Sequence, residues 1–350
     1  MIKTPTKFIA LLSGAAFLMS SAFAQGVTTD PVGYVSNEIS ANSDLKISVP
    51  LIPASVFSAV ADSVSVGTVS TLSVVPDVLT DAHYMLVTSG VLAGDWYTVT
   101  ATTASDVTVA EDLAAGGLLA ADSFEVRPFW TLDTLLPSGG GVPASPDFFG
   151  PVGFVLKNDV AAAGINLAPS QIFFYHDGTL LPAGWYNQGT NLAAGDEVLS
   201  PGSYVTLRNG TGSPVDVVFS GAVPMSTVSN LVVSRSAGTQ DSQIPNPYPA
   251  GMTLANTGLV TDGAMRASPD FFGPLDVLLV YSQQTTGLNP APSSIYFYHD
   301  GTLLPAGWYD QGTNLIADSV ELEVGAALVV RRGAGADEIY SWNPVLPYSL

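Results

Sequence analysis

The chain has 350 residues, with 30 acidic and 10 basic side chains and a formal net charge of −20 at pH 7. A surface of this sign repels phosphates, so the composition excludes a nucleic-acid-binding protein and argues against docking on anionic membranes. The chain contains no cysteine, so packing alone stabilises it and a cysteine nucleophile is excluded.

The first 24 residues have the three parts of a secretory signal peptide. Lys3 and Lys7 precede an apolar run over 8–19, and Ala22 and Ala24 form a small-residue exit. We predict cleavage before Gln25 and export to the periplasm, the cell surface or the medium. The run is shorter than the roughly 20 apolar residues that a membrane-spanning helix needs. We therefore expect no membrane insertion after cleavage.

The remaining chain has the pattern of many short strands. Val, Thr, Tyr and Phe cluster in runs of a few residues, separated by Gly, Pro, Asn and Asp, which is typical of strands joined by turns. Short helices of one or two turns are expected after prolines, over 54–60, 131–135 and 252–256. We predict an all-β fold of repeated modules of short antiparallel strands, of sandwich or open-barrel type. The expected strands are 45–49, 68–74, 84–88, 96–101, 124–127, 152–156, 172–175, 204–208, 215–219, 277–281, 295–298, 327–331 and 339–342.

An internal duplication organises the chain. Residues 172–192 return as residues 295–315, with only Phe173→Tyr and Asn187→Asp changed. The match continues without a gap from the repeated Ser-Pro-Asp-Phe-Phe-Gly-Pro segments, 145–151 and 268–274, as far as Pro224 and Pro347. The two copies are therefore predicted to have the same structure.

A third, degenerate copy is predicted at the front of the chain. A Trp-Tyr pair occurs at Trp96, Trp185 and Trp308, and each pair is followed by a strand that ends in an arginine, at Arg127, Arg208 and Arg331. We expect a signal peptide over 1–24 and three β modules over 25–127, 128–245 and 246–350. The strand over 45–49 is expected to pair near the C-terminal module and cover an exposed edge. Each arginine is expected to pair with a carboxylate at the edge of its module.

The Trp-Tyr hairpins are the candidate ligand site. Neighbouring residues in a strand face opposite sides, so one ring of each pair should be buried and the other exposed. Packing favours a core anchor. The alternative is a platform on which sugars stack, with polar neighbours that bind hydroxyl groups. The residues of this tentative site are Trp185, Tyr186, Asp177 and Asn187, and their counterparts Trp308, Tyr309, Asp300 and Asp310.

Two further patterns suggest metal binding, although turn chemistry explains both. His176-Asp177 and His299-Asp300 have no second histidine in either copy to complete a zinc site. Asp before Gly is typical of a hairpin turn. Asp147 and Asp270 fit a proline turn. No Asp-x-Asp-x-Asp-Gly loop is present, so calcium is only a weakly supported cofactor and no other is expected.

The sequence contains few signs of catalysis. It has no Gly-x-Ser-x-Gly elbow and no His-Glu-x-x-His motif. A pair of carboxylates for glycoside hydrolysis stays open, because such partners can lie far apart in sequence. We expect a protein that is not an enzyme.

Several segments resemble a known group of proteins. They are Thr29-Asp-Pro-Val-Gly-Tyr34, Phe129-Trp-Thr-Leu132, and the repeated Ser-Pro-Asp-Phe-Phe-Gly and Ala-Pro-Ser-x-Ile-x-Phe-Tyr sequences. Together with the signal peptide they resemble a paralogous family of exported verrucomicrobial proteins, over most of the mature chain. The resemblance implies export and a β-rich fold, and it carries over no catalytic residue.

These patterns favour an exported, non-enzymatic structural or interaction protein of the cell envelope. Its expected partners are envelope proteins or glycans. The alternative is a carbohydrate-binding protein that uses the duplicated Trp-Tyr hairpins.

Overall fold

The computed structural model describes residues 30–76, 79 and 82–348. The predicted signal peptide over 1–24 lies outside these residues. Twenty-five strands, two short α-helices and two short 3₁₀ helices make up the described chain, and every pair of adjacent strands is antiparallel. The prediction of an all-β fold is confirmed.

The first copy folds into what we call the first module. Its main sheet has the order β13-β12-β11-β15-β2, and two small sheets pair β1 with β16 and β10 with β14. In β16 the side chains alternate, with Val217 and Phe219 buried and Val218 half exposed, as expected for a strand with one face on the core. The bounds are β1 Val32–Ile39, β2 Ser43–Ser48, β10 Trp130–Thr131, α2 Leu132–Leu135, η1 Pro137–Gly139, β11 Gly153–Asn158, β12 Pro169–His176, β13 Gly184–Asn187, β14 Val198–Leu199, β15 Tyr204–Asn209 and β16 Val215–Ala222.

The second copy forms the second module with the same plan. Its main sheet has the order β22-β21-β20-β24-β18, and β17 pairs with β25 and β19 with β23. Each strand of this module therefore has a counterpart in the first. The bounds are β17 Asn230–Ser234, β18 Gln240–Pro245, β19 Met252–Thr253, η2 Leu254–Asn256, β20 Asp276–Tyr281, β21 Ser294–His299, β22 Gly307–Asp310, β23 Glu321–Leu322, β24 Ala327–Arg332 and β25 Glu338–Trp342.

The front of the chain contains an inserted domain. It is a single sheet of order β3-β9-β6-β7-β8-β5-β4, with a separate hydrophobic core. In the second module β18 leads directly to β19, whereas in the first this domain interrupts the chain between β2 and β10. The bounds are β3 Phe57–Val60, β4 Ser63–Ser65, β5 Thr68–Ser70, β6 His83–Val87, β7 Trp96–Thr102, β8 Asp106–Val109, α1 Leu113–Gly116 and β9 Ser123–Pro128.

This plan moves the expected module boundaries. β1 and β2 belong to the first module, and residues 230–245 belong to the second, because β17 and β18 pair with β25 and β24. The predicted boundary at 245 is therefore too late, and the predicted module over 25–127 combines two structures. The strand expected over 45–49 pairs with β15, and it meets the C-terminal module through the bond from Ser48 N to Gly325 O at 3.0 Å.

The predicted short helices are confirmed in part. α2 follows Thr131, whose hydroxyl accepts a hydrogen bond from Thr134 N in a capping box. Over 252–256 the chain forms a short strand and a 3₁₀ turn. The helix expected over 54–60 is wrong, because Phe57–Val60 is a strand with alternating burial. None of the predicted helices covers α1, whose first turn is capped by Asp112.

The two modules meet through reciprocal contacts. Asp44 in β2 accepts two bonds from Arg208, of 2.7 and 2.8 Å, and Asp44 N donates to Gly287 O in the second module at 3.0 Å. The counterparts repeat this arrangement: Asp241 in β18 accepts bonds of 2.7 and 2.8 Å from Arg331, and Asp241 N donates to Gly164 O at 2.9 Å. Each module thus makes to the other the same contact that it receives. Reciprocal contacts of this kind are typical of an isologous interface, so the modules pack as the halves of a symmetric dimer would.

The predicted arginine–carboxylate pairs are confirmed at all three positions. Arg127 differs from the expected exposed pair, because it is only 2% exposed and binds Glu125 at 2.6 Å and Asp30 at 3.0 Å. Its guanidinium also donates to Pro53 O at 2.5 Å. This arginine ties the inserted domain to the segment that precedes it.

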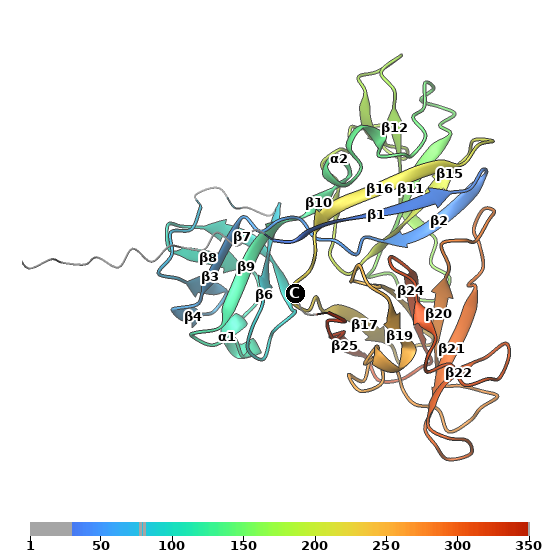
Figure 1. Cartoon of the computed structure of the whole chain (residues 1–350). Helices are drawn as coiled ribbons and strands as arrows, with labels where there is room; N and C mark the ends of the chain where they lie inside the picture. The colour runs from blue at the N-terminus through green and yellow to red at the C-terminus, as the bar shows by residue number, and fades with distance from the viewer. Residues whose placement is uncertain (1–29, 77–78, 80–81, 349–350) are drawn as a thin grey trace, which may run out of the picture.

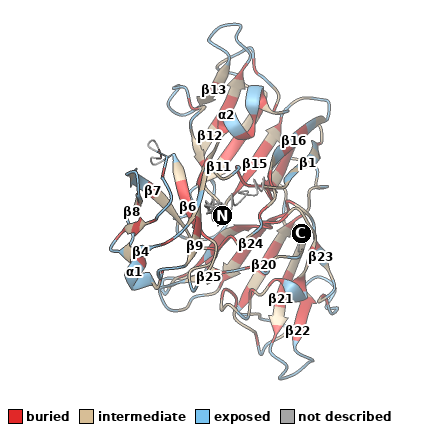
Figure 2. Cartoon of the chain, turned by 60° about the vertical axis from the view of Figure 1, so that its left-hand side comes forward, coloured by how far each residue is buried: buried red, intermediate tan, exposed pale blue. Residues whose placement is uncertain are grey.

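Figures 1 and 2 show the resulting arrangement. The hairpin β12–β13 lies at one end of the molecule and β21–β22 at the opposite end, with the inserted domain beside the middle. None of the helices in the described residues has the length and apolar character needed to cross a bilayer.

Candidate functional site

The duplicated tryptophans are core anchors. Trp185 is 1% exposed and Trp308 is 2% exposed, and each packs edge-on against the tyrosine opposite it, Tyr175 at 5.5 Å and Tyr298 at 5.7 Å. Trp185 Nε1 also donates to Leu136 O at 3.2 Å. Neither indole presents a face on which a sugar could stack, so the predicted platform is wrong at these two positions.

The neighbouring tyrosines pack within the hairpins. Tyr186 stacks on Phe174 at 6.0 Å and meets Phe148 edge-on at 5.8 Å. Its hydroxyl donates to Pro182 O at 3.0 Å. Tyr309 makes the matching contacts with Phe297, Phe271 and Pro305. The tyrosines therefore hold the Ser-Pro-Asp-Phe-Phe-Gly loop against the hairpin.

The four polar residues of the predicted site form turns. Asp177 Oδ1 accepts a bond from Thr179 N and Asp300 Oδ1 from Thr302 N, both at 2.9 Å. These backbone bonds lower the pKa of both carboxyl groups. Asn187 Oδ1 accepts from Gly189 N at 2.8 Å, and Asp310 Oδ1 makes the same bond to Gly312 N at 2.8 Å. Their side chains are thus engaged by the backbone that they shape.

The histidines of the His-Asp pairs are fully buried. Nδ1 of His176 accepts a bond from Gly178 N, and Nδ1 of His299 accepts one from Gly301 N, both at 3.1 Å. Each Nδ1 is thus engaged by the backbone of the Asp-Gly turn that follows the histidine. The described residues include no group of three or more His, Asp or Glu placed to hold a metal ion.

The predicted calcium residues also build turns. Asp147 Oδ1 accepts from Phe149 N, and Asp270 Oδ1 accepts from Phe272 N, both at 2.9 Å. This is the local side-chain bonding that aspartate favours after a proline turn. No other carboxylate joins them in a metal-binding group within the described part of the chain.

A hollow lies beside the first hairpin and differs between the copies. It has a volume of about 470 Å³ and is lined by Asp133, Ser138, Tyr175, Tyr186 and Gly195, among others. In the second module Asp318 stands at the position of Gly195 and accepts a bond from Trp308 N at 2.8 Å. Asp133 is the single carboxylate of the hollow, so the two carboxylates that glycoside hydrolysis requires are not assembled there.

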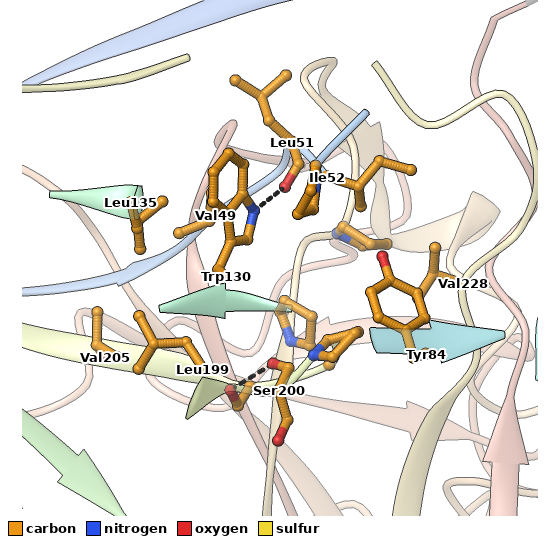
Figure 3. A pocket seen from close by; sticks show the side chains of 16 residues that line it. Val49, Leu51, Ile52, Tyr84, Trp130, Leu135, Leu199, Ser200, Val205 and Val228 are labelled. Carbon is orange, nitrogen blue, oxygen red and sulfur yellow. Dashed lines mark hydrogen bonds between the residues drawn. The ribbon is translucent and has the colours of Figure 1, made fainter. Parts of the chain in front are cut away.

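An apolar cavity lies where the two modules meet the inserted domain. Figure 3 shows Trp130, Leu51, Tyr84 and Val228 around it, and Trp130 Nε1 donates to Leu51 O at 3.1 Å. The cavity encloses about 50 Å³, whereas sites for small molecules usually have about 300–1,000 Å³. It is a packing void at a junction rather than a ligand site.

The duplicated segments end in exposed apolar side chains. We call residues 145–151 with 172–192 the first tip, and residues 268–274 with 295–315 the second tip. Phe149 is 90% exposed, Leu180 70% and Leu192 67%, and their counterparts are exposed to similar extents: Phe272 89%, Leu303 73% and Leu315 67%. Sequence reasoning missed these residues, although apolar side chains inside turns were a signal for them.

The chain matches no known family model, no curated protein and no solved structure. The resemblance to exported verrucomicrobial proteins therefore stays a prediction.

Proposed function

We propose that this is an exported, non-enzymatic interaction protein of the cell envelope, which binds partner proteins through its two tips. The observation that supports this most is the identity of exposed residues in the two copies. Phe149, Leu180 and Leu192 bury little area in the fold, so packing does not require them. Retention of the same exposed apolar residues in both tips is what a shared binding role would impose.

The charge distribution supports the same proposal. The chain has 30 acidic residues, yet the stretch 178–192 of the first tip contains no Asp, Glu, Lys or Arg, and the matching stretch 301–315 of the second tip contains only Asp310. Apolar cores depleted of charge are typical of protein interfaces. The tips lie at opposite ends of the molecule (Figure 1), so one copy of the protein can bridge two partners.

The arrangement of the polar groups agrees with a role without catalysis. His176 is fully buried, and Asp177 is held by a backbone bond. The buried histidine therefore offers a substrate no accessible proton donor or acceptor. The alternative of carbohydrate binding at the duplicated hairpins has less support, because Trp185 and Trp308 are buried.

Capture from envelope fractions of the producing cells tests the proposal. We expect the wild type to capture specific proteins, and the double variant Leu180→Ser/Leu303→Ser to lose them. The control Val66→Ser changes an equally exposed residue, 74% exposed, in the inserted domain, and it should capture the same proteins as the wild type. Equal capture by the double variant would refute a role for the tips.

Single variants show whether the two tips act separately. Leu180→Ser and Leu303→Ser should each leave one working tip, so that each binds the partner with about half the wild-type stoichiometry and loses bridging between two partners. Analytical ultracentrifugation with the purified partner measures both. Loss of all binding in one single variant would contradict two equivalent tips.

A further inference from the structure

A third concave region lies where Trp96 of the inserted domain faces the two modules. This groove has a volume of about 300 Å³, at the lower end of the range for small-molecule sites. Its walls come from Trp96, from the loop over 200–203 in the first module, and from β17 and β18 in the second. An adjoining hollow of about 400 Å³ shares Val160, Ser200 and Ser203 with it. Together they can accept an elongated ligand.

Trp96 is held with part of its ring uncovered. Buried Tyr84 and Phe129 meet it edge-on, at ring distances of 6.1 and 6.0 Å, while the residue itself is half-buried. Its Nε1 makes no hydrogen bond to any described residue, in contrast to Trp185 Nε1, which bonds Leu136 O. A fixed, partly exposed indole with an available N–H is suited to pack on one face of a ring and bind its polar edge.

The polar groups of the groove are all uncharged. They include the amides of Asn230 and Gln243 and the hydroxyls of Ser200, Ser229 and Ser242, and no Asp, Glu, Lys or Arg lines the groove. An ionic ligand would find no partner of opposite charge in the groove itself, and the adjoining hollow has one cation and one anion, Lys157 and Asp159. A neutral ligand with several hydroxyl groups would find both donors and acceptors.

One of these groups is a buried acceptor without a donor. Asn230 is 1% exposed, and its Nδ2 donates to Val228 O at 3.1 Å. Its Oδ1 has no hydrogen-bond partner among the described residues. This oxygen lies beside Gly202, where an added Cβ would be only 2.6 Å away, and both residues line the groove. Buried polar atoms are normally satisfied, but this oxygen has less than 1 Å² of exposed surface, so the groove gives a ligand no direct access to it.

We infer that the groove is a binding site for a neutral oligosaccharide, whose sugar ring packs on Trp96 and whose hydroxyl groups bind Gln243 and Ser200. Leu231 and Ile339, 59% and 68% exposed, provide further apolar surface in the groove. The site lies outside both tips, and it does not depend on their role.

A glycan array tests the inference. It carries neutral oligomers of β-glucan, xylan, mannan and N-acetylglucosamine, and its comparison probes are uronic-acid oligomers and uncharged decapeptides. We expect binding to at least one neutral oligosaccharide, with little change between low and high salt. Isothermal titration with that oligosaccharide should show at least tenfold weaker binding for Trp96→Ala and for Ile339→Arg. Gln243→Ala, which removes a side chain without a hydrogen bond to the described residues, should weaken binding several-fold.

Trp96 contacts buried rings, so weaker binding of Trp96→Ala could come from unfolding. Ile339 is exposed and can be replaced without disturbing the core, so weaker binding of Ile339→Arg reports on the groove itself. Val66→Arg is the matched control at a distant exposed site and should bind as the wild type does. Absence of binding to every neutral glycan, or unchanged affinity in Ile339→Arg, would overturn the inference. So would a preference for the acidic glycans or the peptides. The double variant Leu180→Ser/Leu303→Ser should bind the oligosaccharide normally, so failure of the tip proposal and failure of this one are distinguishable.

Discussion

The tips and the inner strands of the two modules have diverged to very different extents. Residues 172–192 and 295–315 differ at two positions, although several of them are exposed. β15 and β24, which lie in the middle of the modules, share only Arg208 and Arg331 at matched positions. A core tolerates exchange of apolar residues if its volume is maintained, so β15 and β24 can differ and still pack. The exposed tip residues have no such reason to stay identical, and this difference directs attention to binding.

The largest expected effect comes from the anchors that both tips share. Trp185→Ala and Trp308→Ala should each lower the free energy of unfolding by about 3–5 kcal/mol, because each leaves a large cavity in a core. Urea denaturation of each single variant measures the loss in the free energy of unfolding. A loss below about 1 kcal/mol at either site would show that its indole does not support the core.

A milder substitution should separate the two anchors. Trp185→Phe removes the bond from Nε1 to Leu136 O, whereas Trp308 has no such bond within the described chain. Trp185→Phe should therefore be about 1 kcal/mol more destabilising than Trp308→Phe. The same urea series checks it, and equal losses would contradict the role of that bond.

The ion pairs Arg208–Asp44 and Arg331–Asp241 allow the stability of the two modules to be compared. Arg208→Ala and Arg331→Ala each leave a buried carboxylate, Asp44 or Asp241, without its cation, and should each cost about 2 kcal/mol. Thermal unfolding should show similar losses for both, because the contacts are reciprocal. Arg235→Ala, which removes guanidinium bonds to the uncharged acceptors Gln240 Oε1 and Ala161 O, is the control. A loss in only one of the pair would mean that the two halves of the interface are not equivalent.

The smallest effect concerns pH at the tips. Backbone bonds lower the pKa of Asp177 and Asp300, so each contributes stability that is present above the unfolded carboxyl pKa of about 4 and is lost as the pH falls through the lower folded value. The protection factors of the amides of Thr179 and Thr302, which are corrected for the intrinsic pH dependence of exchange, should therefore fall together on acidification below about pH 4. Asp177→Asn keeps an accepting oxygen and should remove the pH response at Thr179 alone.

Local sequence patterns determined the secondary structure and the repeat. Runs of Val, Thr, Tyr and Phe predicted 13 of the 25 strands, and they missed β1, β17 and β18 among others. The turn residues explain why Asp177 and Asn187 are bound by their own backbone. The proline that precedes residues 131–135 likewise marked α2. These features depend on neighbours along the chain, which a sequence displays directly.

Only the tertiary structure decided which strands join which module. β2 and β18 occupy matching places at the edges of their sheets, yet they share little more than the aspartates that bind Arg208 and Arg331, and the inserted domain separates β2 from the rest of its module. The same holds for the candidate sites. Whether Trp96, Trp185 or Trp308 is exposed depends on residues distant in sequence that pack against each ring, and no pattern around the Trp-Tyr pairs distinguishes the buried indoles from the one that faces a groove.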